Sequence, residues 1–311
     1  MSLETLNRRI KTTTDLGEIV STMKMLSSVS VTQYEKALQS LSQYGQTIRD
    51  AFHGLFNQDS FQYIPPKIST QKPKILGIII GSDNGLVGRF NKDLIAYTTA
   101  YLEDRTDQPT HFICVGKRMA PLIQSKEHYV EASYPISNSL KELAPISSQL
   151  LNEIDHVISK NKIDLVYLFS NKKKGASAFV PQARQIIPLP SEHMNQLKRS
   201  KWDGKTLPLI TVEKKQLFNA LLHEYLQVVI FHDLVASLES EHYTRMIHMQ
   251  EAEKNIEASL EEFKLEYQQL RQTQITDELI DIVSGAEEMN KQKNQSTLDF
   301  SKKKRKNRRE N

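Results

Sequence analysis

The sequence predicts an α/β protein in which long helices at the two ends flank a central Rossmann-like domain. Three observations support this fold class: the placement of the prolines, the period of the apolar residues in both ends, and alternating strand and helix patterns between them. All eleven prolines lie between Pro65 and Pro208, which leaves 64 residues before them and 103 after them without proline. Because proline disrupts a helix interior, only the two ends can form long uninterrupted helices.

The first long helix is expected over residues 1–60. Apolar side chains return there every three or four residues, beginning with Leu16, Ile19, Met23 and Leu26. This period is typical of a helix with a single apolar stripe. At about 1.5 Å per residue, residues 1–57 of such a helix would span roughly 85 Å and could not be hidden inside a small globule.

The central domain is expected over residues 70–205. Buried strands are predicted at 74–80, 111–115 and 163–169, with helices at 91–102 and 138–160. A Gly-rich turn separates the first strand from the first of these helices. Strands that alternate with helices indicate a mostly parallel sheet covered by helices.

The last long helix is expected over residues 210–289, with an apolar stripe from Phe218 to Leu270 and Glu, Lys and Gln between. Residues 211–289 would span roughly 120 Å. Two narrow stripes of this length are best buried against each other. The sequence therefore predicts an antiparallel coiled coil formed by the two ends of one chain.

Composition indicates a soluble chain of one or two domains, with 311 residues, 39% hydrophobic content and a mean hydropathy of −0.48. We expect neither a signal peptide nor an apolar run long enough to cross a bilayer. The single Cys114 cannot form an internal disulfide, which favours a reducing, cytoplasmic setting.

Charge is concentrated at the end of the chain. Residues 302–311 hold seven basic residues and one acidic residue, whereas the remaining residues sum to −2. The body of the protein is therefore not predicted to bind nucleic acid. Residues 290–311 are expected to form a disordered basic tail, either simply solvated or functional.

The motifs of common enzymes are not matched. Gly81, Gly85 and Gly88 lack the spacing of a dinucleotide fingerprint, and we interpret them as a tight strand-to-helix turn. His242 and His248 are six residues apart and cannot share a helix face as metal ligands, so we interpret them as stripe-edge or solvated side chains. We expect no catalytic residues, no cofactor and no metal.

Residues 271–286 (RQTQITDELIDIVSGA) resemble the closing signature RQxxITxELxEIVSGA of the γ subunit of F-type rotary ATP synthases. Residues 10–26, 81–91 (GSDNGLVGRFN) and 238–249 (LESEHYTRMIHM) resemble further segments of that family in the same order. The resemblance covers the chain up to Met289. The sequence of residues 12–38 is similar to that of the alternate, or N-type, bacterial branch of the family.

The resemblance implies a central rotor shaft that couples ion-driven rotation of the membrane c-ring to ATP synthesis or hydrolysis in a ring of three α and three β subunits. The catalytic sites would lie on the β subunits, so this chain would be non-catalytic. It would be peripheral, at the cytoplasmic face of the bacterial inner membrane and without bilayer insertion, and would also contact ε. Two alternatives stay open: a coiled-coil scaffold and a nucleotide-binding regulator.

The resemblance also implies roles for individual residues. Contacts to the β subunit would be made by Met23, Lys24, Arg271, Gln272 and Thr276. An apolar bearing at the tip would comprise Ile275, Leu279, Ile282 and Val283. The resemblance ends at Met289, and for the basic residues beyond it we hypothesise a regulatory tail, which comprises Lys302, Lys303, Lys304, Arg305, Lys306, Arg308 and Arg309. Packing within the coiled coil or a solvated helix face is the competing interpretation of the first two groups.

Overall fold

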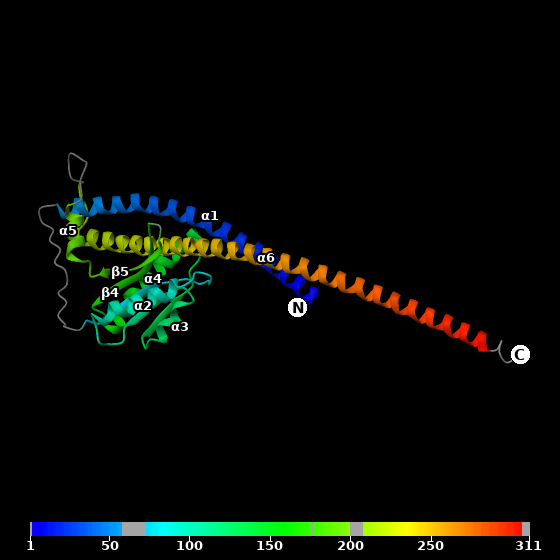
Figure 1. The fold of residues 1–311 in the computed structure, drawn as a ribbon. Coiled ribbons are helices and arrows are strands. Elements are labelled where there is room, and N and C mark those ends of the chain that lie inside the picture. The colour runs from blue at the N-terminus through cyan, green and yellow to red at the C-terminus, as the bar shows by residue number, and fades with distance from the viewer. Residues whose placement is uncertain (1, 58–72, 176, 200–207, 307–311) are drawn as a thin grey trace. The chain divides into compact units, whose positions relative to one another are not determined.

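The computed structural model describes residues 2–57, 73–175, 177–199 and 208–306 (Figure 1). The chain divides into a larger unit, Ser21–Glu251, and a smaller unit formed by Met1–Val20 and Ala252–Asn311. The elements in chain order are α1 (Leu3–Phe56), β1 (Ile75–Ile80), α2 (Phe90–Glu103), β2 (His111–Val115), α3 (Met119–Gln124), β3 (Tyr129–Tyr134), α4 (Leu140–Asn161), β4 (Leu165–Lys174), β5 (Ser177–Ile187), α5 (Ser191–Arg199) and α6 (Lys214–Lys306).

The two proline-free ends form the two long helices that the sequence predicts. Helix α1 has 54 residues and α6 has 93 residues. In the larger unit their order of contact is antiparallel, because Tyr34 of α1 meets His242 of α6 with ring centroids 5.5 Å apart, whereas the later Phe52 meets the earlier Phe218 at 6.0 Å. The prediction of an antiparallel helix pair is confirmed for this unit.

The smaller unit contains its own antiparallel pair. The guanidinium carbon of Arg9 lies 5.9 Å from the ring centroid of Phe263. Further along α1, a Cβ atom added to Gly17 would lie 3.3 Å from a methyl carbon of Ile256. Leu6 is fully buried in this unit.

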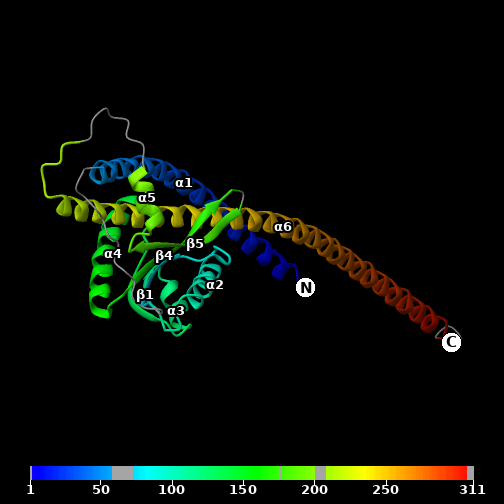
Figure 2. The same cartoon turned by 90° about the vertical axis from the view of Figure 1, so that its left-hand side faces the viewer.

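The sheet of the larger unit has five strands in the order β3-β2-β1-β4-β5. Figure 2 labels three of them, β1, β4 and β5. β1 pairs in parallel with β2 and β4, and β2 pairs in parallel with β3. Only β5 is antiparallel, beside β4 at one edge. The predicted strands at 74–80, 111–115 and 163–169 correspond to β1, β2 and β4, so the mostly parallel sheet is confirmed.

Helices cover both faces of this sheet. On one face, β1 side chains Leu76, Ile78 and Ile80 pack with buried residues of α4 and α6. On the other face, Ile75 and Ile79 pack with residues of α2 and α3. Burial on both faces explains why β1 reads as a continuous apolar run instead of an alternating one.

A third apolar cluster joins α1, α5 and α6 beside the sheet. It contains Ile48, Phe52 and Leu55 of α1 together with Met194 and Leu197 of α5, and Phe218 of α6 joins them. The short helix α5 is not predicted by the sequence. It covers the end of the helix pair in the larger unit, where α1 ends and α6 begins.

Burial of α6 is wider than the predicted stripe. Every residue from Asp233 to His242 is buried. The single-stripe prediction is wrong for this segment because α6 contacts α1 and the sheet at once, so two faces of the helix are covered. His242, expected at the stripe edge or in solvent, is only 7% exposed.

The predicted stripe of α1 is also only partly buried. In the smaller unit, Leu16 and Ile19 are 50% and 55% exposed, and in the larger unit Leu26 is 63% exposed. Their partners on α6 do not cover them, whereas Tyr34 and Phe52 further along are buried. The period of the pattern identified the helix correctly but not the buried face.

One helix of the described residues, α6, is long and apolar enough to span a membrane by length and composition alone, with a window of mean hydropathy 1.2. This differs from the expectation of no such run. Half of that window is buried inside the protein. Leu226, Ile230 and Leu234 of α6 belong to the cluster that packs on the sheet, which accounts for the apolar character of the helix.

The expected disorder of residues 290–311 is not observed where the structure describes the backbone, because α6 continues to Lys306. Residues 290–306 contain neither proline nor glycine, and extending an existing helix adds one hydrogen bond for each residue that is fixed. Basic residues at a helix C-terminus also interact favourably with its dipole. Residues 307–311, including Arg308 and Arg309, lie outside the described residues.

Candidate functional site

The residues predicted to contact a β subunit near the end of α6 lie in the smaller unit and are exposed. Arg271, Gln272 and Thr276 lie on successive turns of the helix, and the Thr276 hydroxyl donates a hydrogen bond to the Gln272 carbonyl oxygen at 2.9 Å. This bond occupies the hydroxyl within the helix. The guanidinium of Arg271 and the amide of Gln272 are exposed to another molecule, and the Thr276 hydroxyl oxygen can still accept a hydrogen bond.

The predicted apolar tip lies on the same segment of α6. Ile275, Leu279, Ile282 and Val283 follow the spacing of one helix face and are 48%, 58%, 68% and 57% exposed. Apolar side chains grouped on one exposed face mark an interaction surface more often than scattered ones do. The structure adds Ile280 and Met289, which are also exposed and were not predicted.

The predicted contact residues on α1 belong to the larger unit. Met23 and Lys24 are half-buried, and the neighbouring Met25 is 66% exposed. Ser30 donates its hydroxyl to the Leu26 carbonyl oxygen at 2.9 Å. The structure thus leaves Met25 as the more accessible apolar side chain of this turn.

In the basic tail, Lys302, Lys303, Lys304, Arg305 and Lys306 form the end of α6. This places five of the seven predicted residues on one helical segment. The sequence alone did not indicate that they would be helical.

The Gly-rich turn at the carboxyl end of β1 is filled by the chain's own side chains, and the turn interpretation is confirmed. A Cβ on Gly81 would lie 2.1 Å from the Met119 sulfur, and Gly88 has a φ of +55°. Asn91 accepts a hydrogen bond from the Ser82 amide at 3.1 Å and donates its own amide to the Ser82 hydroxyl at 2.8 Å. These contacts occupy the crevice in which a doubly wound sheet binds nucleotides.

Asp83, in the same turn, caps two neighbouring segments. Its Oδ1 accepts hydrogen bonds from the backbone amides of Lys117 at 2.8 Å and Ile136 at 3.1 Å. A carboxylate in the place where phosphate groups would lie repels anions. The arrangement therefore ties three loops together and does not present a phosphate cradle.

A set of buried polar residues on α6 was missed by the sequence analysis. Glu241 and Arg245 form an ion pair one turn apart, and Arg245 reaches the Gly85 carbonyl oxygen at 3.4 Å. Burial raises the pKa of Glu241, while the charge of Arg245 opposes the shift. This pair fixes the Gly-rich turn onto α6. Small residues at 236, 240 and 244, one per turn, were the available signal of close packing.

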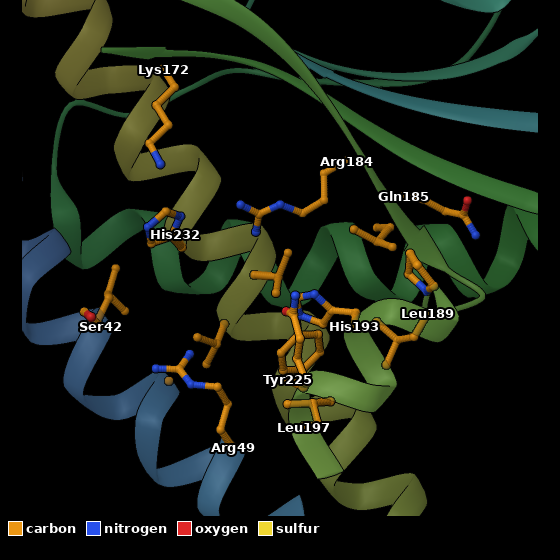
Figure 3. A pocket seen from close by; sticks show the side chains of 17 residues that line it. Ser42, Arg49, Lys172, Arg184, Gln185, Leu189, His193, Leu197, Tyr225 and His232 are labelled. Atoms are coloured by element: carbon orange, nitrogen blue, oxygen red, sulfur yellow. The ribbon is translucent and has the colours of Figure 1, made fainter. Parts of the chain in front are cut away.

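A cavity of about 520 Å³ lies in the larger unit between α1, α5, α6 and the end of β5 (Figure 3). Arg49, Lys172, Arg184, His193 and His232 contribute to its lining. Figure 3 shows the guanidinium of Arg184 near His232, and His193 beside Tyr225. These groups come from segments far apart in the sequence, and no motif pointed to them.

The positive charges of Arg184 and Arg49 act on two titratable side chains of this cavity, His193 and Tyr225. Burial lowers the pKa of His193, and the charges of Arg184 and Arg49 lower it further. Burial raises the pKa of Tyr225, whereas the same two arginines oppose that shift. The Tyr225 hydroxyl and Nε2 of His193 are hydrogen-bonded.

Fold and surfaces together define a class of protein in which two long terminal helices pair antiparallel, a Rossmann-like sheet has its crevice filled from within, and the end of the last helix exposes polar and apolar side chains. A family model described as ATP synthase matches residues 2–289. The chain belongs to that family, as a homologue of ATP synthase gamma chains. Residues 290–311 extend beyond the matched region.

Relatives and solved structures agree with this assignment. The ATP synthase gamma chain of Blochmanniella pennsylvanica (strain BPEN) is 28% identical over 290 residues, which cover 91% of this chain and 98% of the relative. A chain in the Euglena gracilis mitochondrial ATP synthase OSCP/F1/c-ring, rotational state 3, matches with a TM-score of 0.65 at 16% identity, covering 92% of this chain and 94% of that chain. A chain in the Tetrahymena thermophila mitochondrial ATP synthase central stalk and c-ring matches with a TM-score of 0.52 at 18% identity, covering 75% and 99%. At these identities, the two structures support the fold.

Proposed function

We propose that the chain is the central rotor shaft of an F-type ATP synthase and couples rotation of the membrane c-ring to ATP synthesis or hydrolysis in a ring of three α and three β subunits. The observation that carries this proposal is the exposed end of α6, where Ile275, Leu279 and Val283 form an apolar face beside Arg271 and Gln272. Family membership and the match to central-stalk structures support it.

Coupling in this proposal needs no chemistry on the chain itself. An asymmetric shaft contacts three β subunits unequally, so each orientation favours a different conformation at each catalytic site. The coupling is reciprocal, because closing a site biases the shaft as much as the shaft biases the site. The catalytic groups would lie on the β subunits.

In this proposal the helix ends and the sheet meet different partners. Arg271, Gln272 and Thr276, with Met23 and Lys24 on α1, would contact β. Ile275, Leu279, Ile282 and Val283 would turn within the α and β ring as a weakly interacting bearing. The α/β domain would contact ε and the c-ring at the cytoplasmic face of a bacterial membrane, with the chain bound peripherally.

Assembly tests the proposal directly. Co-expressed with the α and β subunits of the same ATPase, the chain should co-purify with them, and the complex should hydrolyse ATP. The purified chain alone should not. Failure to associate with α and β would favour the coiled-coil scaffold or the nucleotide-binding regulator. Hydrolysis by the chain alone would contradict the non-catalytic role.

The contact at Arg271 can be tested within that complex. We expect Arg271→Ala to lower ATP hydrolysis by about tenfold, because a charge-assisted hydrogen bond contributes roughly 1.5–3 kcal/mol. Lys264→Ala is the matched control, since Lys264 is an exposed cation two turns earlier on the same helix. Equal activities of the two variants would mean that Arg271 makes no contact on which coupling depends.

A further inference from the structure

The cavity between α1, α5, α6 and β5 has an unbalanced charge. Arg49, Lys172 and Arg184 line it from three different elements, and none of the described lining residues is Asp or Glu. Asp233 contacts two of the lining residues and is fully buried, with its Oδ1 3.0 Å from Nδ1 of His232 and 3.5 Å from a guanidinium nitrogen of Arg184. A second buried carboxylate, Glu239, interacts electrostatically with Lys172, so three cations lie near two buried carboxylates.

The two arginines keep hydrogen-bond donors available to the cavity. At 3.5 Å the pair of Arg184 with Asp233 is an ion pair without a short hydrogen bond, and a guanidinium carries five N–H donors. Arg49 donates Nε and one terminal nitrogen to Oε1 of Gln46, at 3.1 and 2.9 Å. Its other terminal nitrogen lies over Gly45, where an added Cβ would be only 3.3 Å away. Gly45 itself lines the cavity, so the absence of a side chain there leaves room for the guanidinium.

Part of the remaining lining is apolar. Leu189, Leu197 and Val229 contribute to the apolar part of the wall, and the volume of about 520 Å³ is within the range of small-molecule sites, roughly 300–1,000 Å³. A bare inorganic ion would fill only part of this space. An anionic group attached to a partly apolar body would satisfy both the donors and the apolar wall.

We propose that this cavity binds the phosphate group of an organic phosphate, with Arg49 and Arg184 as the principal ligands and Lys172 as an additional charge. Guanidinium groups match phosphate oxygens with paired N–H donors, which is why arginine is frequent in phosphate sites. The site is separate from the Gly-rich turn, where Asp83 lies. It therefore differs from a nucleotide site at the strand ends, and it does not depend on the rotor function.

The test is calorimetric titration of the purified full-length chain with inorganic pyrophosphate and, separately, with ATP. We expect saturable binding that weakens as salt is added, and a loss of affinity of about tenfold or more in Arg184→Ala and in Arg49→Ala. Since Arg184 pairs with the buried Asp233, its variant could lose stability. Among the described residues, Asp233 pairs with Arg184 and His232 and not with Arg49 or Lys172, so Arg49→Ala and Lys172→Ala test the site without breaking that buried ion pair.

Arg89→Ala is the matched control, because Arg89 is 81% exposed and pairs with Asp93 on α2, away from the cavity. It should bind both probes as the natural chain does. Vesicles of phosphatidylcholine with and without phosphatidylglycerol separate the two sources of phosphate: binding to the anionic vesicles that Arg49→Ala abolishes assigns a lipid headgroup, and binding of soluble probes alone assigns a soluble metabolite. Absence of saturable binding of every probe, or equal affinity in all variants, would overturn the proposal.

Discussion

Single buried residues on α6 carry consequences that the sequence pattern does not show. His242 is 7% exposed, its Nε2 lies 3.4 Å from Oδ1 of Asn138, and its ring lies against that of Tyr34. Burial, with a smaller contribution from the charge of Arg245, lowers the pKa of His242 to about 4. The folded larger unit therefore holds this imidazole neutral over a pH range in which the unfolded chain would protonate it.

This shift predicts a loss of stability in acid. Because the folded pKa is about 4 and the ordinary value is 6.5, the unfolded state binds more protons between these values, so stability falls as pH falls through this window. Relative to His242→Asn, the natural chain should lose up to about 3 kcal/mol of unfolding free energy. Urea titrations of both chains across the window measure the difference. Parallel pH dependences would mean that the histidine does not titrate on unfolding. Glu241, whose pKa burial raises, is present in both chains and cancels in the comparison.

At the scale of elements, the Gly-rich turn depends on glycine at position 88. Its φ is +55°, and an added Cβ would lie 2.4 Å from Nε2 of His248 on α6. Gly88→Ala should therefore destabilise the larger unit by about 1–3 kcal/mol through backbone strain and this contact. Thermal unfolding followed by circular dichroism measures the loss.

Gly175 provides a control for that substitution. It has a similar φ of +57°, but an added Cβ would meet nothing within 4 Å. Gly175→Ala should thus report the backbone cost alone, and Gly88→Ala should cost more. His248→Ala should restore part of the difference. If the two alanine variants were equally stable, the contact between the turn and α6 would contribute nothing.

Lys173 links the hairpin of β4 and β5 to both long helices. Nζ of Lys173 lies 2.7 Å from Oε1 of Glu35 on α1 and 3.4 Å from Oε1 of Glu239 on α6, and 4.5 Å from the ring centroid of Tyr243. Although burial opposes it, the two carboxylates raise the pKa of Lys173. The ammonium thus connects three elements of the larger unit.

Removing this ammonium should expose the cost of burying Glu239, which is 8% exposed and whose pKa burial raises. We expect Lys173→Ala to lower the unfolding free energy by about 1–3 kcal/mol, less at acidic pH, where Glu239 can take up a proton. Chemical denaturation at two pH values measures this. Lys174→Ala, at the exposed neighbouring position, should be neutral, and Glu239→Gln should rescue part of the loss. No effect of Lys173→Ala would mean that this lysine does not contribute to the attachment of the hairpin.

The strands and α6 show which features of the fold can be predicted from the sequence. β1, β2 and β4 were predicted because strands buried on both faces read as apolar runs. β3 and β5 were missed because they are the edges of the sheet, where polar residues are tolerated; β5 even accommodates Pro181, opposite Asn171 of β4. The buried Glu241 and Arg245 were missed because periodicity reveals one contact face, whereas α6 has two.

At the scale of the whole molecule, residue roles that depend on partner chains remain predictions. The structure places Arg271 and the apolar tip on one exposed segment, as expected, but their roles require the α and β subunits. The cavity near Arg184 could not be predicted, because its cations come from α1, β4 and β5 and meet only after folding.

The extension beyond the family match offers a test on the assembled complex. If the basic residues from Lys302 onward touch acidic surface and restrain rotation, truncation after Met289 should raise the ATP hydrolysis rate at low salt. Added salt should bring the natural complex toward the truncated one, since about 0.1 M salt screens exposed charges beyond roughly 10 Å. Steady-state hydrolysis at several ionic strengths measures both effects.

A full-length variant with glutamine in place of the seven basic residues separates charge from length. It should behave like the truncated chain if charge restrains rotation, and like the natural chain if only the length matters. Unchanged hydrolysis and unchanged salt dependence after truncation would mean that the extension has no part in regulation.

Cys114 is the only cysteine of the chain; it lies in β2 without exposed surface, and burial raises the pKa of its thiol to about 12. Thiolate is the reactive form toward alkylating reagents, so the folded protein offers them almost none. A cysteine introduced at an exposed position of α6 would then be the sole reactive sulfur. Fluorophores or spin labels can be attached there to follow motion, with every native residue of the core left in place.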